Sequence, residues 1–396
     1  MRNLALNSRS NGRHAMLRIY GVLNFILCFA MQLKSISASN FRNLKGEIVF
    51  NDGLNVFFGA NGEGKTNWLE AIDLLATTRS FRTSKLTETV AFGERLAIVS
   101  GQVADSPEVT RKLQVAIDGN TKILTINDKK EAASRYLGHL FAVRFTADEL
   151  EIVRGTPEAR RRFLDAGITG LHPPFVQVAA DYARVIRQKN SLLQTARDEG
   201  WTAEKTGELL EPWNEQLARL ATHIHKARVR FVERLNEVLE RKLFGREEVA
   251  IRYASSLEGK GDLSAYGELI KERLKLRVQA ELVSGHALIG THRDDLEITF
   301  DGHDLRKFGS AGQQRSALLI LLLAEVTVFE ATRGEYPLFL IDDIDAELDY
   351  RRIANLLDFL AGKTQTFVTT SKESFVERFG AGASVFDVLH GAAEAR

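Results

Sequence analysis

Eight consecutive residues have the composition and spacing of a phosphate-binding loop. They are Gly59, Ala60, Asn61, Gly62, Glu63, Gly64, Lys65 and Thr66. Glycines let such a loop turn so that its backbone N–H groups face phosphate oxygens, while the lysine reaches the β- and γ-phosphates and the threonine hydroxyl ligates Mg²⁺. The pattern therefore predicts a site for ATP and Mg²⁺, in which Lys65 also serves catalysis and Thr66 binds the metal.

The residues on either side of the loop predict the elements that must position it. The apolar run 54–58 predicts a buried strand, and apolar residues at 68, 69, 72 and 75 predict a helix that begins at the loop. Phosphates bound there would lie at a helix N-terminus, which favours anions. The order strand, loop, helix distinguishes a functional loop from a chance glycine pattern.

A second nucleotide motif lies far downstream. The apolar run 337–341 ends in Asp342 and Asp343, which is a Walker B pattern. We expect this run to form a central parallel strand beside the loop strand, so that Asp342 and Thr66 share one Mg²⁺. Asp343 stands where many ATPases of this architecture have a glutamate that orients or deprotonates the attacking water, and we assign it that catalytic role.

Length and composition limit the function only weakly. The chain has 396 residues, of which 44% are apolar and 27% charged, as in a folded protein of two domains. A net charge of +1 neither favours nor excludes DNA binding. The single cysteine, Cys28, excludes an intrachain disulfide framework and a cysteine-rich metal site, and fits a reducing cytosol.

Residues 1–30 combine arginines, no acids and a short apolar stretch, as a signal peptide does. The alternative is a start codon assigned too far upstream, with translation beginning at Met31. We favour this alternative because the stretch is shorter than the roughly 20 residues of a membrane span, and because ATP is a cytosolic ligand. We therefore expect residues 1–30 to be an extension from a mis-assigned start, and a cytoplasmic protein without membrane association.

The spacing of apolar residues predicts an ATPase head split by an inserted lobe. Runs at 96–103, 112–117 and 123–126, with a turn at 118–120, predict an antiparallel sheet. Helical spacing from 175 to about 245 predicts two long helices that pack on each other. Because the two nucleotide motifs must meet, we expect the chain to return to the head after a loop at 257–262. The expected divisions are 31–160 and 263–396 for the head and 161–262 for the helical lobe.

Small residues precede the strongly apolar helix predicted at 317–325. Ser310 offers a hydroxyl, Gly312 permits close approach and Gln313 follows, all at a helix start that favours phosphate. A Ser-Gly cap alone is usually structural. Placed shortly before the Walker B strand, this segment resembles the signature loop of ABC-type ATPases. That resemblance implies an ATP-dependent homodimer in which Ser310, Gly312 and Gln313 of one copy contact the nucleotide of the other. Residues 346–349 resemble the loop that crosses this interface, with Ala346 where serine is more frequent.

Several stretches in combination resemble the RecF family, from Gln32 to about Asp387. They are 40–44, 61–67, 155–165, 292–296 and 309–315. The resemblance implies an α/β fold, with an ABC-type P-loop ATPase head, an antiparallel β-subdomain and an inserted helical lobe. It further implies weak, DNA-stimulated ATP hydrolysis that acts as a switch, ATP-driven dimerisation and binding of double-stranded and gapped DNA. The implied partners are RecR and RecO, which would act with this protein to load RecA at single-strand gaps.

Two other functions stay open at this stage. One is the ATPase subunit of a membrane transporter, against which Thr369 and Thr370 stand where transporters carry a histidine that senses the γ-phosphate. A threonine hydroxyl can hydrogen-bond phosphate or water but lacks the charge switch of histidine. The other is a non-catalytic scaffold in which ATP is only structural.

Basic residues are candidates for contacts with DNA phosphates. Two groups stand out in the sequence: residues 160–162 with Arg184, Arg187 and Lys189, and Arg79 with Arg82 and Lys85. Both groups could follow a phosphate backbone, but most such runs are solvated surface. The sequence leaves both interpretations open.

Overall fold

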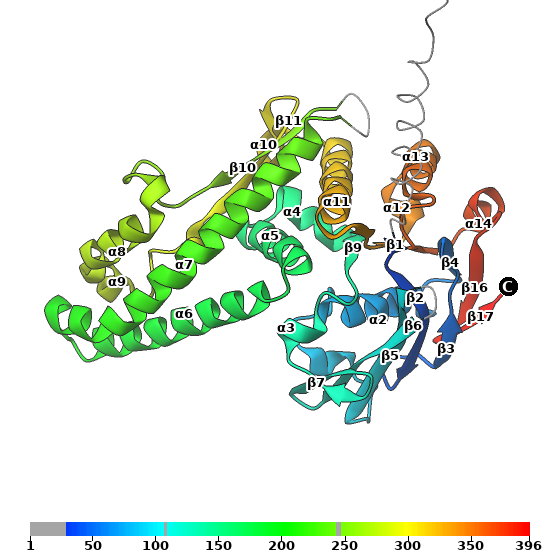
Figure 1. The fold of residues 1–396 in the computed structure, drawn as a ribbon, viewed down its shortest axis with the longest axis horizontal. Helices are drawn as coiled ribbons and strands as arrows, with labels where there is room; N and C mark the ends of the chain where they lie inside the picture. The colour runs from blue at the N-terminus through cyan, green and yellow to red at the C-terminus, as the bar shows by residue number, and fades with distance from the viewer. Residues whose placement is uncertain (1–28, 107–108, 243–246) are drawn as a thin grey trace, which may run out of the picture.

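The computed structural model describes residues 29–106, 109–242 and 247–396 (Figure 1). The signal-like residues 1–28 lie outside this range. Within it, no helix has both the length and the apolar character needed to cross a membrane. The short elements are β1 (Phe29–Ala30), η1 (Leu86–Thr89), α3 (Ala133–Tyr136), η2 (Ala147–Leu150), α4 (Glu151–Arg154), η3 (Leu263–Ala265), η4 (Thr291–Arg293), α10 (Leu305–Phe308), β13 (Glu335–Tyr336) and α12 (Ile344–Glu347).

Both nucleotide motifs lie on one mostly parallel sheet of six strands. Its order is β17 (Ala392–Ala395), β16 (Ser384–Leu389), β4 (Leu54–Phe58), β15 (Thr366–Thr370), β14 (Leu338–Ile341) and β9 (Ala142–Phe145). All neighbouring pairs are parallel except β16 and β17. The expectation that the Walker B strand lies beside the loop strand is wrong, because β15 pairs with both β4 and β14 and separates them. Helices α13 (Tyr350–Leu360) and α14 (Glu373–Phe379) occupy the connections around β15.

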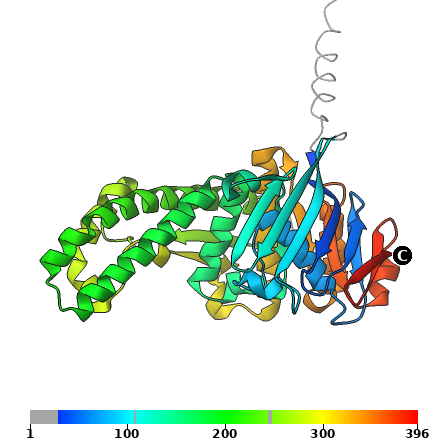
Figure 2. The same cartoon turned by 90° about the horizontal axis from the view of Figure 1, so that it is seen from below.

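The second sheet is the expected antiparallel one. Its order is β3 (Gly46–Val49), β2 (Gln32–Ser39), β5 (Leu96–Ser106), β6 (Val109–Asp118), β7 (Thr121–Ile126) and β8 (Lys129–Lys130). Figure 2 shows its long strands running side by side. The predicted turn joins β6 to β7, and Gly119 has the positive φ of 53° that favours glycine there. Helix α2 (Lys65–Thr77) packs between the sheets, contacting β15 on one side and β5 and β6 on the other.

The lobe contains the two long helices expected from the sequence, α6 (Phe175–Asp198) and α7 (Ala203–Leu239), packed on each other. It also contains α5 (Pro157–Leu171), α8 (Tyr266–Leu276), α9 (Val278–Ser284) and a small sheet of β10 (Val249–Ala254), β11 (Asp295–Phe300) and β12 (His303–Asp304). The chain does not return to the head after residue 262, because α8 and α9 pack on α7. The apolar residues Tyr266, Leu269, Ile270 and Leu274 are buried in this packing.

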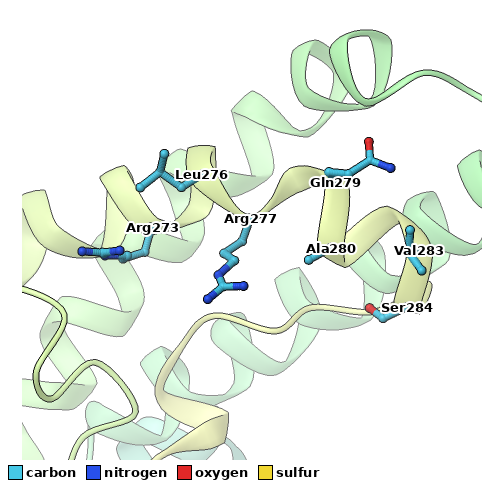
Figure 3. A pocket seen from close by; sticks show the side chains of 7 residues that line it. All are labelled: Arg273, Leu276, Arg277, Gln279, Ala280, Val283 and Ser284. Carbon is cyan, nitrogen blue, oxygen red and sulfur yellow. The ribbon is translucent and has the colours of Figure 1, made fainter.

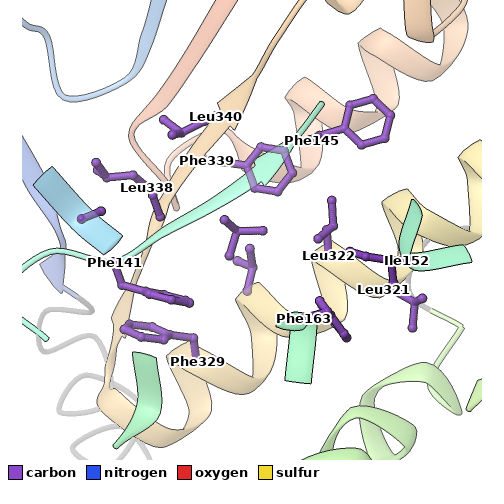
Figure 4. Packing of buried hydrophobic residues seen from close by; sticks show 14 of the residues in the cluster. Phe141, Phe145, Ile152, Phe163, Leu321, Leu322, Phe329, Leu338, Phe339 and Leu340 are labelled. Atoms are coloured by element: carbon purple, nitrogen blue, oxygen red, sulfur yellow. The ribbon is translucent and has the colours of Figure 1, made fainter. Parts of the chain in front are cut away.

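Helix α11 (Ala311–Arg333) connects the lobe with the head (Figure 1). It contacts β9 of the parallel sheet and also α5 and α7 of the lobe. Phe329 of this helix stacks on Phe141, with ring centroids 4.7 Å apart (Figure 4). Leu321 and Leu322 are buried in the same cluster. A continuous apolar core therefore joins the two halves of the molecule through this helix.

Candidate nucleotide site

The phosphate loop has the backbone geometry predicted from its glycines. Gly62 and Gly64 have φ values of 90° and 113°, and α2 begins directly after them at Lys65. The Lys65 ammonium donates to the carbonyl oxygens of Gly59 and Ala60, both at 2.8 Å. Burial lowers the pKa of Lys65, and the charges of nearby acids, Asp343 first among them, oppose this shift. A phosphate oxygen is a charged acceptor, so it can replace these neutral carbonyls as the lysine's partner.

The structure brings Thr66 and Asp342 together although they are 276 residues apart in the chain. The Thr66 hydroxyl donates to Asp342 Oδ1 at 2.9 Å. Burial raises the pKa of the Asp342 carboxyl, while hydrogen bonds from the Thr369 and Thr66 hydroxyls favour its charged form. A hydroxyl and a carboxylate are the oxygen ligands that Mg²⁺ accepts beside substrate phosphates. The residues present therefore fit a magnesium ion that accompanies a nucleotide.

Asp343 occupies an exposed position next to Asp342. Its φ of 47° is left-handed, which is unusual for a residue other than glycine. Its N–H donates to the Thr369 hydroxyl at 2.7 Å. Strained backbone of this kind persists where surrounding contacts hold it, and it is concentrated at functional sites.

Two supports of the phosphate loop were missed in the sequence. The N–H of Gly391 donates to the Glu63 carbonyl at 2.8 Å, and the N–H of His390 donates to the Glu63 carboxylate at 2.6 Å. Asn43 contributes a longer hydrogen bond to the same carbonyl, at 3.4 Å. The loop is thus held between the turn that joins β16 to β17 and the segment after β2. In the sequence, Gly391 could have indicated a tight turn. Nothing in the surrounding residues indicates that this turn contacts Glu63.

The predicted signature residues lie at the start of α11. Ser310 caps this helix, since its hydroxyl accepts the Gln313 N–H while the Gln313 side chain accepts the Ser310 N–H. Ser310 and Gln313 are exposed and Gly312 is partly exposed. In the described part of the chain, no hydrogen bond or ion pair joins these three residues to the phosphate loop. One copy of the chain therefore does not bring the two predicted halves of the site together.

The residues predicted to resemble an interface loop are tied to this same helix. Arg315 Nε lies 2.9 Å from a carboxylate oxygen of Glu347 in α12. Ala346 is exposed, and Asp349 caps α13 by accepting the Arg352 N–H at 2.9 Å. The ion pair holds the start of α11 next to the segment that follows the Walker B strand.

Three of the basic residues considered for DNA are used inside the fold. Arg160 is 3% exposed and binds both carboxylate oxygens of Asp295, at 2.7 and 2.9 Å. Arg161 donates to the Asp294 carbonyl at 2.7 Å. Lys189 is fully buried, 2.7 Å from Glu281. For these three, the structural interpretation holds, whereas Arg79, Lys85 and Arg162 are exposed.

A hollow of about 640 Å³ lies in the lobe, far along the chain from the nucleotide motifs (Figure 3). It is lined by residues of α8 and α9 and by Arg277 between them: Arg273, Leu276, Arg277, Gln279, Ala280, Val283 and Ser284. None of the predicted site residues lines it. The nucleotide site is accordingly defined by the loop and strand ends described above.

Comparison with known proteins identifies the family. Residues 32–393 match the family described as RecF/RecN/SMC N terminal domain. The chain is 35% identical over 353 residues to the DNA replication and repair protein RecF of Halothermothrix orenii, covering 86% of this chain and 92% of that protein. It is 32% identical to the solved "Structure of the recombination mediator protein RecF-ATP in RecFOR pathway", with a TM-score of 0.85 over 94% of this chain and 99% of that one.

A more distant likeness concerns the fold alone. The solved SMC head bound to the C-winged helix domain of ScpA is 15% identical, with a TM-score of 0.51 over 92% of this chain and 96% of that one. The α/β fold of an ABC-type ATPase head with an antiparallel β-subdomain, expected from the sequence, is confirmed. The chain belongs to the RecF family of DNA replication and repair proteins.

Proposed function

We propose that this protein is an ATP-dependent DNA-binding protein of recombinational repair and replication-gap processing, which dimerises on ATP and hydrolyses it slowly. The observation that carries the proposal is the hydrogen bond between the Thr66 hydroxyl and the Asp342 carboxylate, 2.9 Å long, beside the phosphate loop. Two motifs distant in sequence thereby offer one set of ligands for ATP and Mg²⁺. The relative solved with ATP supports the same assignment.

Each residue of this centre has a distinct proposed role. Lys65 leaves the carbonyls of Gly59 and Ala60 to bind the β- and γ-phosphates, and the loop N–H groups bind the remaining phosphate oxygens. Thr66 and Asp342 hold Mg²⁺, which when bound neutralises charge on the phosphates. Asp343 is the acid that orients the attacking water.

Gly312 supports the proposed dimer, because nothing within a single copy of the chain requires a glycine at this position. A Cβ added at Gly312 would have only Ser310 Oγ within 4.0 Å, and Gly312 does not have a positive φ. Gly312 is the second residue of α11, and glycine is less favourable than alanine in a helix. In the proposed dimer, the absence of a side chain at Gly312 allows the second copy to approach closely. Ser310, Gly312 and Gln313 then contact the nucleotide that the other copy holds.

Double-stranded and gapped DNA are the proposed nucleic-acid partners. Exposed Arg79 and Lys85 follow α2, and Lys122 lies near Arg79, bonded to the Thr78 carbonyl and hydroxyl. Such a surface suits phosphate contacts. RecR and RecO are the proposed protein partners in the cytoplasm, with RecA loading as the outcome, because a similar protein is described in the RecFOR pathway.

Lys65→Met tests this proposal by removing the phosphate-binding ammonium. We expect ATP binding, ATP-dependent dimerisation and turnover to fall at least about 100-fold, because the charged hydrogen bonds to phosphate are lost. Light scattering measures dimerisation, and phosphate release with and without gapped duplex DNA measures turnover. Lys271→Met, on the exposed face of α8, is the matched control.

Two outcomes of that experiment would count against the proposal. Normal ATP-dependent dimerisation of Lys65→Met would exclude the loop as the switch. Asp343→Asn, measured alongside, separates a switch from a scaffold: we expect it to dimerise with ATP but to lose turnover. Equal turnover of Asp343→Asn and wild type would remove Asp343 from catalysis.

A further inference from the structure

Strand β15 lies between the loop strand β4 and the Walker B strand β14, and it ends in two buried threonines. Thr369 is 1% exposed and Thr370 is fully buried. Their position at the carboxyl end of the strand places their hydroxyls beside the acids that follow β14. In the sequence these hydroxyls were candidates for contact with phosphate or water.

The Thr369 hydroxyl is already engaged by both Walker B acids. It donates to Asp342 Oδ1 at 2.7 Å and accepts the Asp343 N–H at 2.7 Å. A hydroxyl has one proton to donate. Because that proton goes to the Asp342 carboxylate, it is not available to a phosphate oxygen, which can only accept.

These two hydrogen bonds orient the two acids to which we assign metal binding and water orientation. Asp342 Oδ1 accepts from Thr369 and Thr66, so the carboxylate is oriented by hydroxyls from β15 and α2 together. Asp343 has a left-handed φ of 47°, and its N–H is held by the same Thr369 oxygen. One side chain thus sets the direction of the metal-binding carboxylate and the backbone of the water-orienting acid.

Thr370 makes a separate contact further along the same segment. Its hydroxyl donates to Asp345 and accepts the Lys372 N–H at 3.1 Å. It therefore restrains α12 without touching Asp342 or Asp343. The two neighbouring threonines differ in which acid they hold.

We propose that Thr369 is a positioning residue for ATP hydrolysis, which acts by fixing the Asp342 carboxylate and the Asp343 backbone and makes no contact with the nucleotide itself. The inference rests on the proposed function. It assigns the strand end a role in aligning the Walker B acids, in place of sensing the γ-phosphate.

Thr369→Val tests the inference because valine keeps the shape and removes the hydroxyl. We expect kcat to fall about 10- to 100-fold, as is usual when a partner that orients a metal ligand is lost, with the Kd for ATP changed less than about threefold. The Mg²⁺ concentration for half-maximal turnover should rise. Thr369→Ser should restore most of kcat, because serine keeps the hydroxyl.

Thr366→Val is the matched control on the same strand. Thr366 is 3% exposed and its hydroxyl bonds to the Thr364 hydroxyl at 2.9 Å, at the opposite end of β15 from the acids. We expect this variant to keep wild-type turnover. Urea unfolding of all variants shows whether each is folded, and should Thr369→Val not fold, a Thr369→Ser turnover well below wild type would itself overturn the inference.

The outcomes separate this inference from the proposed function. If wild type turns over ATP and Thr369→Val matches Thr366→Val, the positioning role is excluded while the ATPase stands. Loss of ATP affinity with unchanged kcat would show that the hydroxyl contacts the nucleotide, which also overturns the inference. A wild type without ATP turnover would overturn the proposed function and the inference together.

Discussion

Two polar clusters of this molecule satisfy their charges in different ways. In the phosphate-loop centre, the Lys65 ammonium is held by neutral carbonyls and the Asp342 carboxylate by neutral hydroxyls. In the lobe-root cluster, comprising Arg160, Asp165, Arg228 and Asp295, each arginine binds a carboxylate through two hydrogen bonds. These distances are 2.7 and 2.9 Å for Arg160 with Asp295, and 2.8 and 2.9 Å for Arg228 with Asp165.

The difference indicates which charges are available to a ligand. A charged group with neutral partners gains by exchanging them for an oppositely charged ligand. A buried arginine with a bidentate carboxylate loses by any such exchange, because one charge would remain buried and unpaired. Stretches 155–165 and 292–296, which contribute the acids and Arg160 of the lobe-root cluster, support the family resemblance as the phosphate loop does. A charged sequence motif of the family can therefore either bind a ligand or stabilise the fold through buried ion pairs.

Arg228→Met removes an arginine from the lobe-root cluster, and we expect it to have the largest effect on stability. Asp165 would lose its cation and the Thr291 carbonyl would lose a donor. We expect the free energy of unfolding to fall by about 3 kcal/mol, measured by urea denaturation, while the folded variant keeps wild-type ATP affinity. Arg162→Met, on the exposed face of α5 with only a 3.7 Å pair to Glu158, should change stability by less than about 0.5 kcal/mol. Equal stability of the two variants would contradict the structural role.

Glu325→Gln tests the protonation of a buried carboxyl in α11, the helix that connects the lobe with the head. Glu325 is buried in α11, and burial together with the charge of Glu149 raises its pKa from 4.5 to about 8, opposed by Arg144. The folded chain therefore holds a proton that the unfolded chain releases, so wild-type stability falls as pH rises between these values. The limiting slope is about 1.4 kcal/mol per pH unit for one proton.

Glutamine is neutral at every pH and removes this dependence. From pH 5.5 to 7.5, we expect Glu325→Gln to gain about 2 kcal/mol of unfolding free energy relative to wild type, measured by urea denaturation at each pH. Glu237→Gln, on the exposed face of α7, is the control and should show a constant difference. A constant difference for Glu325→Gln as well would mean that this carboxyl is ionised throughout the range.

The sequence predicted the local parts of the site because they are contiguous. Strand, loop and helix around Lys65 follow each other in the chain, and the Ser310 cap is set by residues three apart. The two packed helices of the lobe also followed from apolar spacing. The catalytic role of Lys65 and the dimer-interface role of Ser310 stay predictions.

The long-range arrangement could not be obtained from the same patterns. The apolar run 337–341 is equally compatible with lying next to β4 or one strand further away, and only the fold inserts β15 between them. The apolar face of α8 is the same whichever domain it packs on, so it could not show that the lobe continues beyond residue 262. Thr369 was visible as a hydroxyl at a strand end, but its partners depend on the sheet order.

Gly391→Ala probes the turn between β16 and β17, which supports the phosphate loop through its hydrogen bonds to Glu63. An added Cβ would lie 1.8 Å from the Asn43 carbonyl oxygen, so the turn must move away from Asn43, and this shift would disturb the hydrogen bond from the Gly391 N–H to the Glu63 carbonyl. We expect the Kd for ATP to rise about tenfold, or about 1.4 kcal/mol, in a titration with a fluorescent ATP analogue. Gly382→Ala is the matched control, because its φ of 81° resembles the 85° of Gly391 while no atom lies within 4 Å of the added Cβ. Both variants strain the backbone alike, so an equal Kd in the two would show that the turn does not support the loop.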